Sequence, residues 1–579
     1  MSVDARRDRV QDLALSVLLG VVTLGPLLVR RGFALRGDMV FVPHQPWKDA
    51  WLGWDGSTSR FVPGDAVLSA LTQGVPGDLL QKILLLGIFV LAGTGAGLLV
   101  RHHGFVARAA AIVLICWNPW VAERLLIGQW GVVVGYAALP WVVMAAVVVR
   151  DDARRGLPAL VCWLGFTALW SPPSAIVGAL TALCVVIVRP RAASVTAVLG
   201  SALVVNLPWL VPPLLTPGRL GDTGAQFEAF AARGESGAGV LASVLSLGGI
   251  WKSSVVPDER TLVPVVLLSG VTTMAAVIGW RLELAGAPAT RRATGAGLAL
   301  LAAVSLLVAV LPAVPVVTTA LESATGSFPP LAILRDSHRF LGPAVLVLLP
   351  GVAAATAWLW RRRPGAEATR ALALVLGLWP ALCLPSSAWG MRGALEPVTY
   401  PAEWFAVAEL LDADDPGTTV VLPWRGGYRG YGWNDHRAVL DPAPRFFAGD
   451  VLIDDRLYVG DTGLTNEDPR LTDVTAALAA GDPGRELSRL GVTHILVEKG
   501  NGVTADQAPE GAVLHDGRHL MLVSLGPATG AETYAEPARW AVVAADLVAA
   551  AALLLALVGV LRRRVYGDLA HDDSGRGST

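Results

Sequence analysis

Apolar runs long enough to cross a lipid bilayer recur along the whole of this 579-residue chain. A run of about 20 apolar residues crosses the bilayer as a helix, because a helix satisfies its own backbone hydrogen bonds where there is no water. With 53% hydrophobic and 16% charged residues, the chain is too apolar for a soluble enzyme. The sequence predicts a polytopic α-helical membrane protein with about twelve transmembrane helices, centred near residues 20, 90, 114, 140, 164, 181, 204, 271, 305, 350, 379 and 550.

The distribution of arginines predicts how these helices are oriented. Basic residues collect in cytoplasmic loops, and here they precede the first run and recur at every second connection. The first run lacks a small-residue cleavage site and is therefore expected to stay in the protein. The richness in alanine, valine, glycine and arginine is typical of a bacterial genome of high GC content. We therefore expect a multi-pass protein of the bacterial plasma membrane with both termini in the cytoplasm. Representative basic residues are Arg6, Arg7, Arg9, Arg150, Arg154, Arg155, Arg291, Arg292, Arg562 and Arg563.

The longer polar segments all fall on the opposite, extracytoplasmic side. Within the last of them, "PAEWFAVAELLDAD" has helical periodicity, while "TTVVLPW", "VTHILVEKG" and "HLMLVSLG" have the composition of strands. The predicted outer loops are 31–65, 118–130, 216–260 and 317–340. The predicted domains are a transmembrane module of eleven spans at 1–388, a small extracytoplasmic α/β domain at 389–538, and a final helix with a cytoplasmic tail at 539–579.

Net charge and cysteine content exclude several classes of function. A net charge of -1, without a long basic tract, gives no indication of nucleic-acid binding. The cysteines lie inside apolar runs and are interpreted as small hydrophobic residues, not as disulfides or metal ligands. They are Cys116, Cys162, Cys184 and Cys383.

Asp38, in "LRGDMVFVPHQPW", is the leading candidate for a catalytic residue. It follows the first apolar run by a few residues, so its carboxylate is held near the outer surface of the membrane. A carboxylate there can take the proton of a hydroxyl that attacks an activated sugar. It can equally cap a short helix or pair with Arg36. Asp49 and Asp55, in the same loop, compete for the catalytic role.

Three tryptophans of the same loop, Trp47, Trp51 and Trp54, recur at helical spacing. Indole rings settle at the depth of lipid headgroups, so we interpret the segment as an amphipathic helix lying on the membrane surface. Stacking of the indoles against a sugar is the alternative interpretation.

Cationic side chains also gather in the outer loops, although the positive-inside rule places most of them on the other side. Their presence indicates an anionic group, such as a lipid phosphate, which the planar donor fork of arginine binds well. The alternative is pairing with Glu123, Asp336 or lipid headgroups. The outer cationic residues are Arg30, Arg31, Arg36, Lys48, Arg124, Arg335, His338 and Arg339.

Three of these segments resemble the GT-C superfamily of integral-membrane glycosyltransferases, which use polyprenyl-phosphate-linked sugar donors. They are "LRGDMVFVPHQPW", "NPWVAERLLIGQWGVVVGYAALPW" and "LRDSHRF". The sequence is most similar to the actinobacterial arabinofuranosyltransferase-like branch, which builds cell-wall arabinan. The resemblance covers the layout of the membrane part, and the chain is much shorter than the large members of that branch.

The resemblance implies an inverting sugar transfer at the outer face, with Asp38 as the general base. The donor is expected to be a polyprenyl-phosphate sugar, with arabinofuranose or mannose favoured, and the acceptor a cell-envelope glycan or glycolipid. Membrane lipids are the other expected partners, and the oligomeric state is left open. The residues implied to bind the lipid phosphate are Arg124, Arg335, His338, Arg339 and Lys48, with Glu123, Gln129, His44 and Asp336 expected to support them.

One departure from the family concerns metal dependence. Many relatives carry paired acidic residues in the first outer loop, whereas Asp38 stands alone in "GDM". The sequence therefore predicts no metal site and no cofactor, and leaves a divalent cation as an open alternative.

The outer domain contains an aromatic segment, "LPWRGGYRGYGWNDHR", that suits binding of a glycan acceptor. Its aromatic residues are interpreted either as a sugar-binding surface or as the packed core of a hairpin. They are Trp424, Tyr428, Tyr431 and Trp433.

Two other functions fit parts of the sequence. A transporter or flippase of a lipid-linked sugar would carry ionisable residues near mid-membrane and often repeated halves. A non-catalytic envelope-assembly protein would not need Asp38. The span centres are nearly free of charge, which favours the enzyme.

Overall fold

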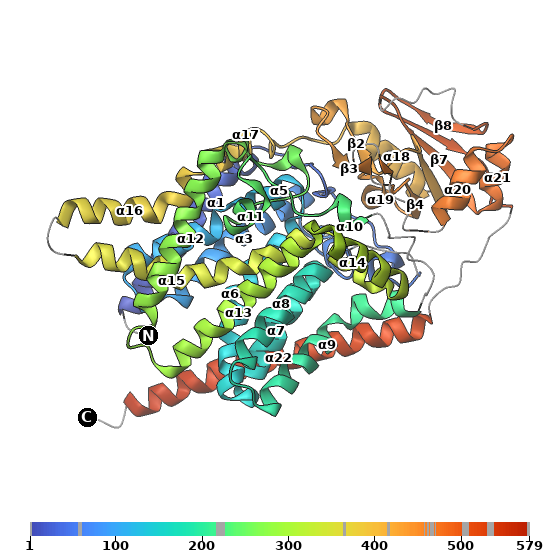
Figure 1. Ribbon diagram of the computed structural model, residues 1–579. Coiled ribbons are helices and arrows are strands. Elements are labelled where there is room, and N and C mark those ends of the chain that lie inside the picture. The colour runs from blue at the N-terminus through green and yellow to red at the C-terminus, as the bar shows by residue number, and fades with distance from the viewer. Residues whose placement is uncertain are drawn as a thin grey trace.

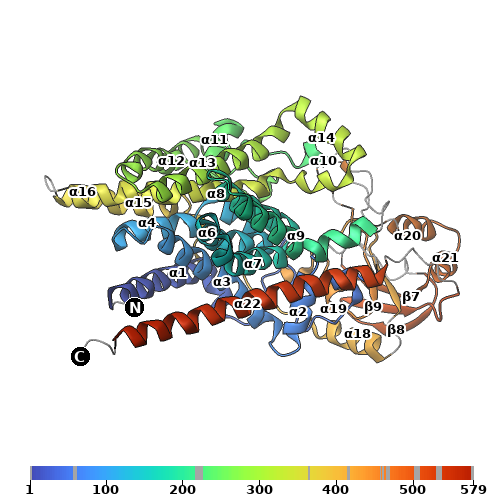
Figure 2. The ribbon, with the colours of Figure 1, turned by 90° about the horizontal axis from the view of Figure 1, so that it is seen from below.

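The computed structural model describes most of the chain, and its long helices form one body with a small sheet at one end (Figure 1). We call this the sheet end. The start of α1 (Val3–Val29) and the end of α22 (Arg539–Gly575) lie at the opposite end of the body in both views (Figures 1 and 2). Residues 56–60 and 216–225 of the predicted outer loops lie outside the described part. The described residues are 3–55, 61–215, 226–362, 366–413, 417–529 without 457, 460–461, 464–467, 469 and 501–508, and 538–575.

Every apolar run predicted to span the membrane is helical in the structure. Nine helices of the described part are long and apolar enough to cross a membrane. The remaining three are short or begin with charge: α8 has 16 residues, α16 has 17, and the 18 residues of α7 begin "ARR". The polytopic class is confirmed, and the count of twelve stays a prediction. Besides α1 and α22 the helices are α3 (Gly77–Leu99), α4 (Phe105–Cys116), α6 (Trp130–Asp151), α7 (Ala153–Trp170), α8 (Pro172–Ile187), α9 (Ala192–Leu215), α12 (Val263–Leu284), α13 (Ala289–Val310), α15 (Val345–Arg361) and α16 (Ala366–Leu382).

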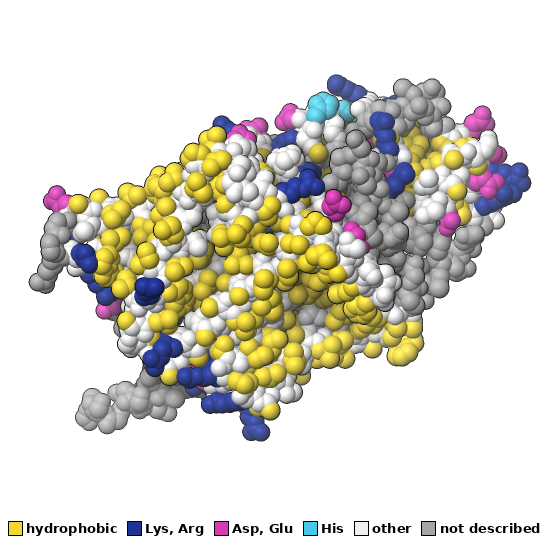
Figure 3. Space-filling model, in the orientation of Figure 1, with side chains coloured by type: hydrophobic (Ala, Val, Ile, Leu, Met, Phe, Trp, Pro, Cys, Tyr) yellow, Lys and Arg dark blue, Asp and Glu magenta, His cyan; other side chains and the backbone are white. Residues whose placement is uncertain are grey.

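Small residues let the long helices pack closely. At Gly279 of α12 an added Cβ would lie 1.8 Å from the carbonyl oxygen of Gly351 in α15, so only glycine permits this approach. Apolar side chains also cover much of the outer surface of the helices (Figure 3). A body that is apolar both inside and outside is what a lipid environment selects, because lipid does not drive apolar groups inward.

The polar segment near the C-terminus folds into a five-stranded mixed sheet in the order β4-β1-β7-β9-β8. The pairs β1–β4 and β1–β7 are parallel, and β9 joins β7 and β8 in antiparallel pairs. The predicted helix is α18 (Ala402–Ala413), and the three predicted strands are β1 (Thr418–Leu422), β7 (Val492–Glu498) and β9 (Leu520–Ser524). The other strands are β4 (Asp450–Leu452) and β8 (Ala512–Asp516), and a separate hairpin is formed by β2 (Tyr428–Arg429) and β3 (Val439–Leu440).

The tryptophan segment of the first outer loop is not the predicted amphipathic helix. It holds one short 3-10 helix, η1 (Asp49–Leu52). Trp51 is buried and donates to the carbonyl of Pro46 at 2.9 Å, while the indole of Trp54 donates to Asp546 of α22 at 2.9 Å. Tertiary contacts with α22 therefore override the helical spacing, and only Trp47 stays exposed, at 52%.

Candidate active site at the sheet end

Asp38 lies on a tight turn at residues 36–39, which follows α1 and is held from two sides. The backbone N–H of Asp38 donates to the carbonyl of Ile127 at 2.9 Å, in the connection that precedes α6. The N–H of Gly37 donates to the carbonyl of Ala438 at 2.8 Å, in the hairpin of the sheet domain. We call residues 36–39 the Asp38 turn. It joins the membrane body to the sheet domain.

Two glycines make this close approach feasible. Gly128 has φ +88°, and an added Cβ would lie 2.3 Å from the carbonyl oxygen of Arg36 and 2.5 Å from the nitrogen of Asp38. Gly37 has φ +54°, and a Cβ there would lie 2.0 Å from the carbonyl oxygen of Ile127. Both positions need the left-handed backbone that glycine adopts without penalty. The glycines of "RGDM" and "IGQW" thus set the position of the Asp38 carboxylate.

The side chain of Asp38 accepts hydrogen bonds on both oxygens. The hydroxyl of Tyr428, on β2, donates to Oδ1, and the amide of Gln129 donates to Oδ2 at 3.3 Å. The ammonium of Lys252 lies 5.6 Å from the centre of the Tyr428 ring. Burial lowers the pKa of Lys252, and the negative charge of Asp38 opposes this shift. The Asp38 carboxylate, the Tyr428 phenol and the Lys252 ammonium therefore lie close together.

Gln129 connects Asp38 to the cationic side chains of Arg124 and of Arg339, the latter in the motif "LRDSHRF". Its side-chain oxygen accepts from Arg124 Nη1 at 2.5 Å and from Arg339 Nε at 3.3 Å. Asp336 Oδ2 accepts from Arg124 Nη1 at 2.9 Å and forms an ion pair with Arg339, with Nε 2.8 Å away. These side chains and Tyr428 form a continuous set, which we call the Asp38 network.

Arg124 and His338 form the fully buried part of this arrangement. Arg124 Nη2 donates to His338 Nδ1 at 2.5 Å and to Asp336 Oδ1 at 3.2 Å. Because a guanidinium only donates, His338 accepts at Nδ1 and carries its proton on Nε2, which donates to the carbonyl of Gly248 at 3.1 Å. Burial alone would raise the pKa of Asp336, but Arg124 and Arg339 hold it below its usual range. Arg124 has no exposed side-chain surface, whereas Arg339 is 25% exposed.

Two further predicted site residues are Glu123, expected to support the phosphate-binding residues, and Arg335, expected to be one of them. Glu123 Oε2 is 3.5 Å from His338 Nε2, and both side chains are fully buried. They lie on and beside α5 (Pro119–Leu126), which Asn118 caps by accepting from the N–H of Val121. Arg335 lies over the ring of Phe230, 5.6 Å from its centre.

Lys48 and His44 make their contacts elsewhere in the first outer loop. The ammonium of Lys48 donates to the carbonyl of Pro444 at 2.7 Å, in the sheet domain. His44 Nδ1 lies 2.9 Å from the carbonyl oxygen of Thr72. The structure thus gives both side chains partners outside the Asp38 network.

The four aromatic residues of the predicted acceptor surface separate into two groups. Trp424 packs against the apolar core of the five-stranded sheet. Tyr431 is buried, donates to Glu498 Oε1 at 2.6 Å, and stacks on Trp433 with ring centres 4.9 Å apart. Tyr428 is the member that contacts Asp38. The packing interpretation therefore fits Trp424, Tyr431 and Trp433, whereas Tyr428 is part of the candidate site.

The described residues contain one group with ligand atoms close enough for a metal ion, His102, His103 and Glu283. The imidazole Nε2 atoms lie 2.9 and 3.0 Å from the two carboxylate oxygens of Glu283, and Arg291 lies 3.6 Å away. Hydrogen bonds to one carboxylate account for these distances, and Arg291 already supplies positive charge. Glu283 lies in the last turn of α12, about 30 Å of helix from the loop that carries Lys252.

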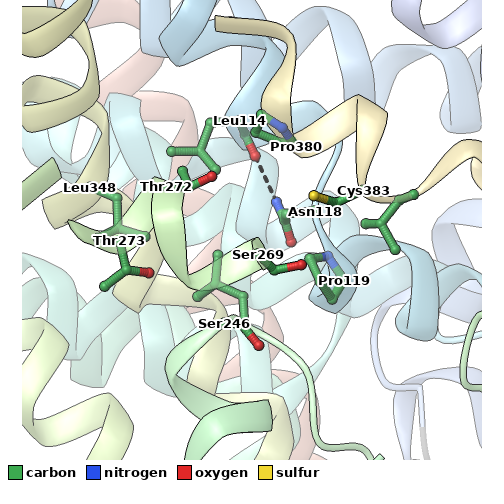
Figure 4. Close-up of a pocket in the computed structure, with 12 residues that line it drawn as sticks. Leu114, Asn118, Pro119, Ser246, Ser269, Thr272, Thr273, Leu348, Pro380 and Cys383 are labelled. Carbon is green, nitrogen blue, oxygen red and sulfur yellow. Dashed lines mark hydrogen bonds between the residues drawn. The ribbon is translucent and has the colours of Figure 1, made fainter. Parts of the chain in front are cut away.

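A small cavity of about 20 Å³ lies beside α5 and is lined by polar side chains such as Ser246, Thr272 and Thr273 (Figure 4). Asn118 points into the same region and donates to the carbonyl of Leu114 at 2.9 Å. A volume of this size holds about one water molecule. It is too small for a sugar.

Lys252 is the residue of this site that the sequence did not single out. It lies in "GGIWKSS", inside the predicted loop 216–260, without a charged neighbour in the sequence. The available signal was composition, since it is one of four lysines in a chain rich in arginine.

Comparison with known proteins finds a similarity in structure but no match in sequence. No protein-family model matches the chain, and no curated protein matches its sequence. The fold of this chain is nevertheless similar to that of a glycosyltransferase of known structure. It is similar to the cryo-EM structure of arabinofuranosyltransferase AftD from Mycobacteria, with a TM-score of 0.57 and 16% identity over 91% of this chain.

The similarity concerns only part of that larger protein. This chain covers 40% of AftD, and in one structure of an AftD point mutant the TM-score is 0.57 at 14% identity, covering 92% of this chain and 42% of that one. The predicted resemblance to the arabinofuranosyltransferase-like branch is therefore confirmed at the level of the fold.

Proposed function

We propose that this protein is a membrane glycosyltransferase of the GT-C type that transfers a sugar from a polyprenyl-phosphate donor to a cell-envelope glycan or glycolipid. The observation that carries the proposal is the position of Asp38. Its carboxylate contacts Tyr428 and is linked through Gln129 to the partly exposed Arg339. The shared fold with an arabinofuranosyltransferase favours arabinofuranose as the sugar, with mannose as the second candidate.

In the proposed reaction Asp38 is the general base. The acceptor hydroxyl attacks the anomeric carbon of the donor, the bond from that carbon to the phosphate oxygen breaks, and Asp38 takes the hydroxyl proton. Attack from the face opposite the phosphate inverts the anomeric carbon. A positioned base of this kind contributes roughly 10²- to 10⁴-fold to the rate. Tyr428 and Gln129 orient the carboxylate through its two oxygens.

The phosphate that leaves gains negative charge, which nearby cations stabilise. Arg339 suits this role because both of its contacts, to Asp336 and Gln129, engage Nε, and a quarter of its side chain is exposed. Lys252 and Arg335 are the other cations to which we assign stabilisation of the leaving phosphate. We assign Arg124 a positioning role, because its described partners lie inside the protein and none of its side chain is exposed.

The proposal places the sheet domain and the Asp38 turn on the extracytoplasmic side and both termini in the cytoplasm. The arginine clusters that support this orientation, such as Arg154 and Arg155, lie at the start of α7. No metal takes part in the proposed steps, since each is assigned to a side chain of this chain.

A reconstitution experiment separates an enzyme from a transporter. The purified protein is placed in vesicles with a radiolabelled polyprenyl-phosphate sugar, arabinose first and mannose second, and with an envelope glycan extract. Label recovered in a glycosidic product supports the enzyme. Label that crosses the membrane while it stays on the lipid phosphate supports a flippase and contradicts the proposal. Label that neither moves nor reacts with either donor contradicts the donor assignment.

A further inference from the structure

A cavity of about 310 Å³ lies beside the Asp38 turn. It is open to solvent and is lined by the loop at 254–258, the segment at 386–394 and Arg437 of the sheet domain, and the turn itself contributes Arg36. The catalytic roles proposed above do not use this cavity. Its polar lining consists mainly of three arginines and three serines, which are Arg36, Arg392, Arg437, Ser254, Ser386 and Ser387.

Several hydrogen-bond donors of this lining are unsatisfied. Arg36 donates through Nε to the carbonyl of Leu126 at 2.8 Å, and its terminal nitrogens have no hydrogen-bond partner among the described residues. Arg437 is held by backbone carbonyls, including that of Glu396 at 2.7 Å from Nη1. Its Nη2 is buried without a hydrogen bond in the described part of the chain, and so is the hydroxyl of Ser387. The terminal nitrogens of Arg36 are thus the unsatisfied donors of the cavity itself, while Arg437 Nη2 and the Ser387 hydroxyl are buried in its wall. Buried polar groups normally have partners, so donors left unsatisfied in and beside a cavity indicate a ligand.

The charges around the cavity are not balanced. Asp258 pairs with Arg392, and both side chains are well exposed, at 76% and 65%. Asp435 lies 3.6 Å from Arg437 Nη2 and is itself 76% exposed. Burial and the positive charge of Arg437 both lower the pKa of Arg36. The fold therefore holds two partly buried cations close together, an arrangement that a bound anion stabilises.

We propose that this cavity binds a phosphate group and that it is a site separate from the Asp38 network. Guanidinium forks and hydroxyls are the usual partners of phosphate. A charge of about −2 on a phosphate monoester suits an excess of arginines over carboxylates. The cavity is larger than one phosphate, which leaves room for the group esterified to it. This inference does not depend on the proposed transferase activity.

Isothermal titration calorimetry on the full-length protein in detergent micelles tests the site, with inorganic phosphate as the probe. We expect Arg36→Gln to weaken binding at least about 10-fold, since loss of a charge-assisted fork costs about that much. Ser387→Ala removes one buried hydroxyl and is expected to weaken binding by about 3-fold, without disturbing the fold. The exposed Arg233→Gln, which belongs to neither site, is the control and should bind like wild type.

Two results would overturn the proposal. One is absence of phosphate binding by the wild-type protein. The other is binding that Arg339→Gln abolishes while Arg36→Gln and Ser387→Ala leave it unchanged, which would move the site to the Asp38 network.

A second titration, with polyprenyl phosphate, identifies the source of the phosphate. Tighter binding than inorganic phosphate, lost in Arg36→Gln, assigns the cavity to a lipid phosphate. Binding no tighter than inorganic phosphate, with the same dependence on Arg36, assigns it to a water-soluble phosphate ester.

Discussion

Tyr428 and Asp38 are 390 positions apart in the chain, yet the hydroxyl of the tyrosine donates to the carboxylate. One residue belongs to the sheet domain and the other to the first turn after α1. The sheet domain is therefore part of the candidate active site, and it supplies one of the two side-chain hydrogen bonds that Asp38 receives from the described residues.

The first prediction concerns this contact. Tyr428→Phe removes the hydroxyl but keeps the ring beneath Lys252. One hydrogen bond to a charged group is worth about 1.5–3 kcal/mol, so we expect sugar transfer to fall about 10-fold or more, with donor binding unchanged. Steady-state kinetics with a radiolabelled donor measures the effect. An unchanged kcat would show that the phenol does not orient the base.

The second prediction concerns Gly128. An added Cβ at this position collides with the backbone of Arg36 and Asp38, and its φ of +88° strains any other residue. We expect Gly128→Ala to lose transfer activity. The strain should lower the free energy of unfolding by about 1–3 kcal/mol or more, so the variant should unfold at a lower temperature. Gly87→Ala is the matched control, because a Cβ there has no atom within 4 Å. Equal thermal stability of the two variants would contradict the account of the turn.

The third prediction separates positioning from binding at Arg124. Arg124→Met leaves Asp336 buried beside a single remaining arginine, and breaking a buried ion pair typically costs about 3–5 kcal/mol. The double variant Arg124→Met, Asp336→Leu removes both charges and should recover much of the lost melting temperature. Sugar transfer should stay low in the double variant, because Gln129 loses its contact with Arg124 and Arg339 loses its contact with Asp336. Recovery of activity along with stability would refute a positioning role.

The fourth prediction concerns pH and the sheet domain. Burial, followed by the charge of Asp441, raises the pKa of Glu498 from 4.5 to about 8, although Arg429 donates to it at 2.8 Å. Between pH 4.5 and 8 the folded state thus holds one proton more than the unfolded state. Its stability is highest at the acidic end and falls as the pH rises through this window, by at most about 1.4 kcal/mol per pH unit.

Thermal unfolding of the full chain in detergent between pH 5 and 9 checks this sign. Glu498→Gln removes the titrating group and should flatten the profile. A wild-type melting temperature that rises with pH over the same range would contradict the assignment.

Local patterns in the sequence were sufficient to locate the helices, three strands of the sheet and the motifs that carry Asp38, Arg124 and Arg339. Periodicity and composition report on segments of about 10–20 residues, and each of these features fits within one such segment. The tryptophans of the first outer loop show the limit of such patterns. Their helical spacing was real, but contacts with Pro46 and Asp546 decide their structure.

The site itself depends on contacts that no local pattern contains. Nothing near Tyr428 distinguishes it from Tyr431, yet one contacts Asp38 and the other Glu498. Lys252 sits in a glycine- and serine-rich loop whose position is set by tertiary packing. The cavity beside Arg36 is also lined by Arg437, 401 residues later in the chain, and only the folded structure brings the two cations together.

The central claim is that Asp38 is the base of a sugar transfer, and replacement of its carboxylate tests this most directly. Membranes carrying wild-type protein, Asp38→Asn or Asp49→Asn are given a radiolabelled polyprenyl-phosphate sugar. Asp49 pairs with Arg539 at 2.8 Å and serves as the matched control in the same loop. The account predicts transfer by wild type and Asp49→Asn, and a loss of at least about 100-fold in Asp38→Asn at equal membrane insertion. Equal transfer by Asp38→Asn and wild type would contradict it.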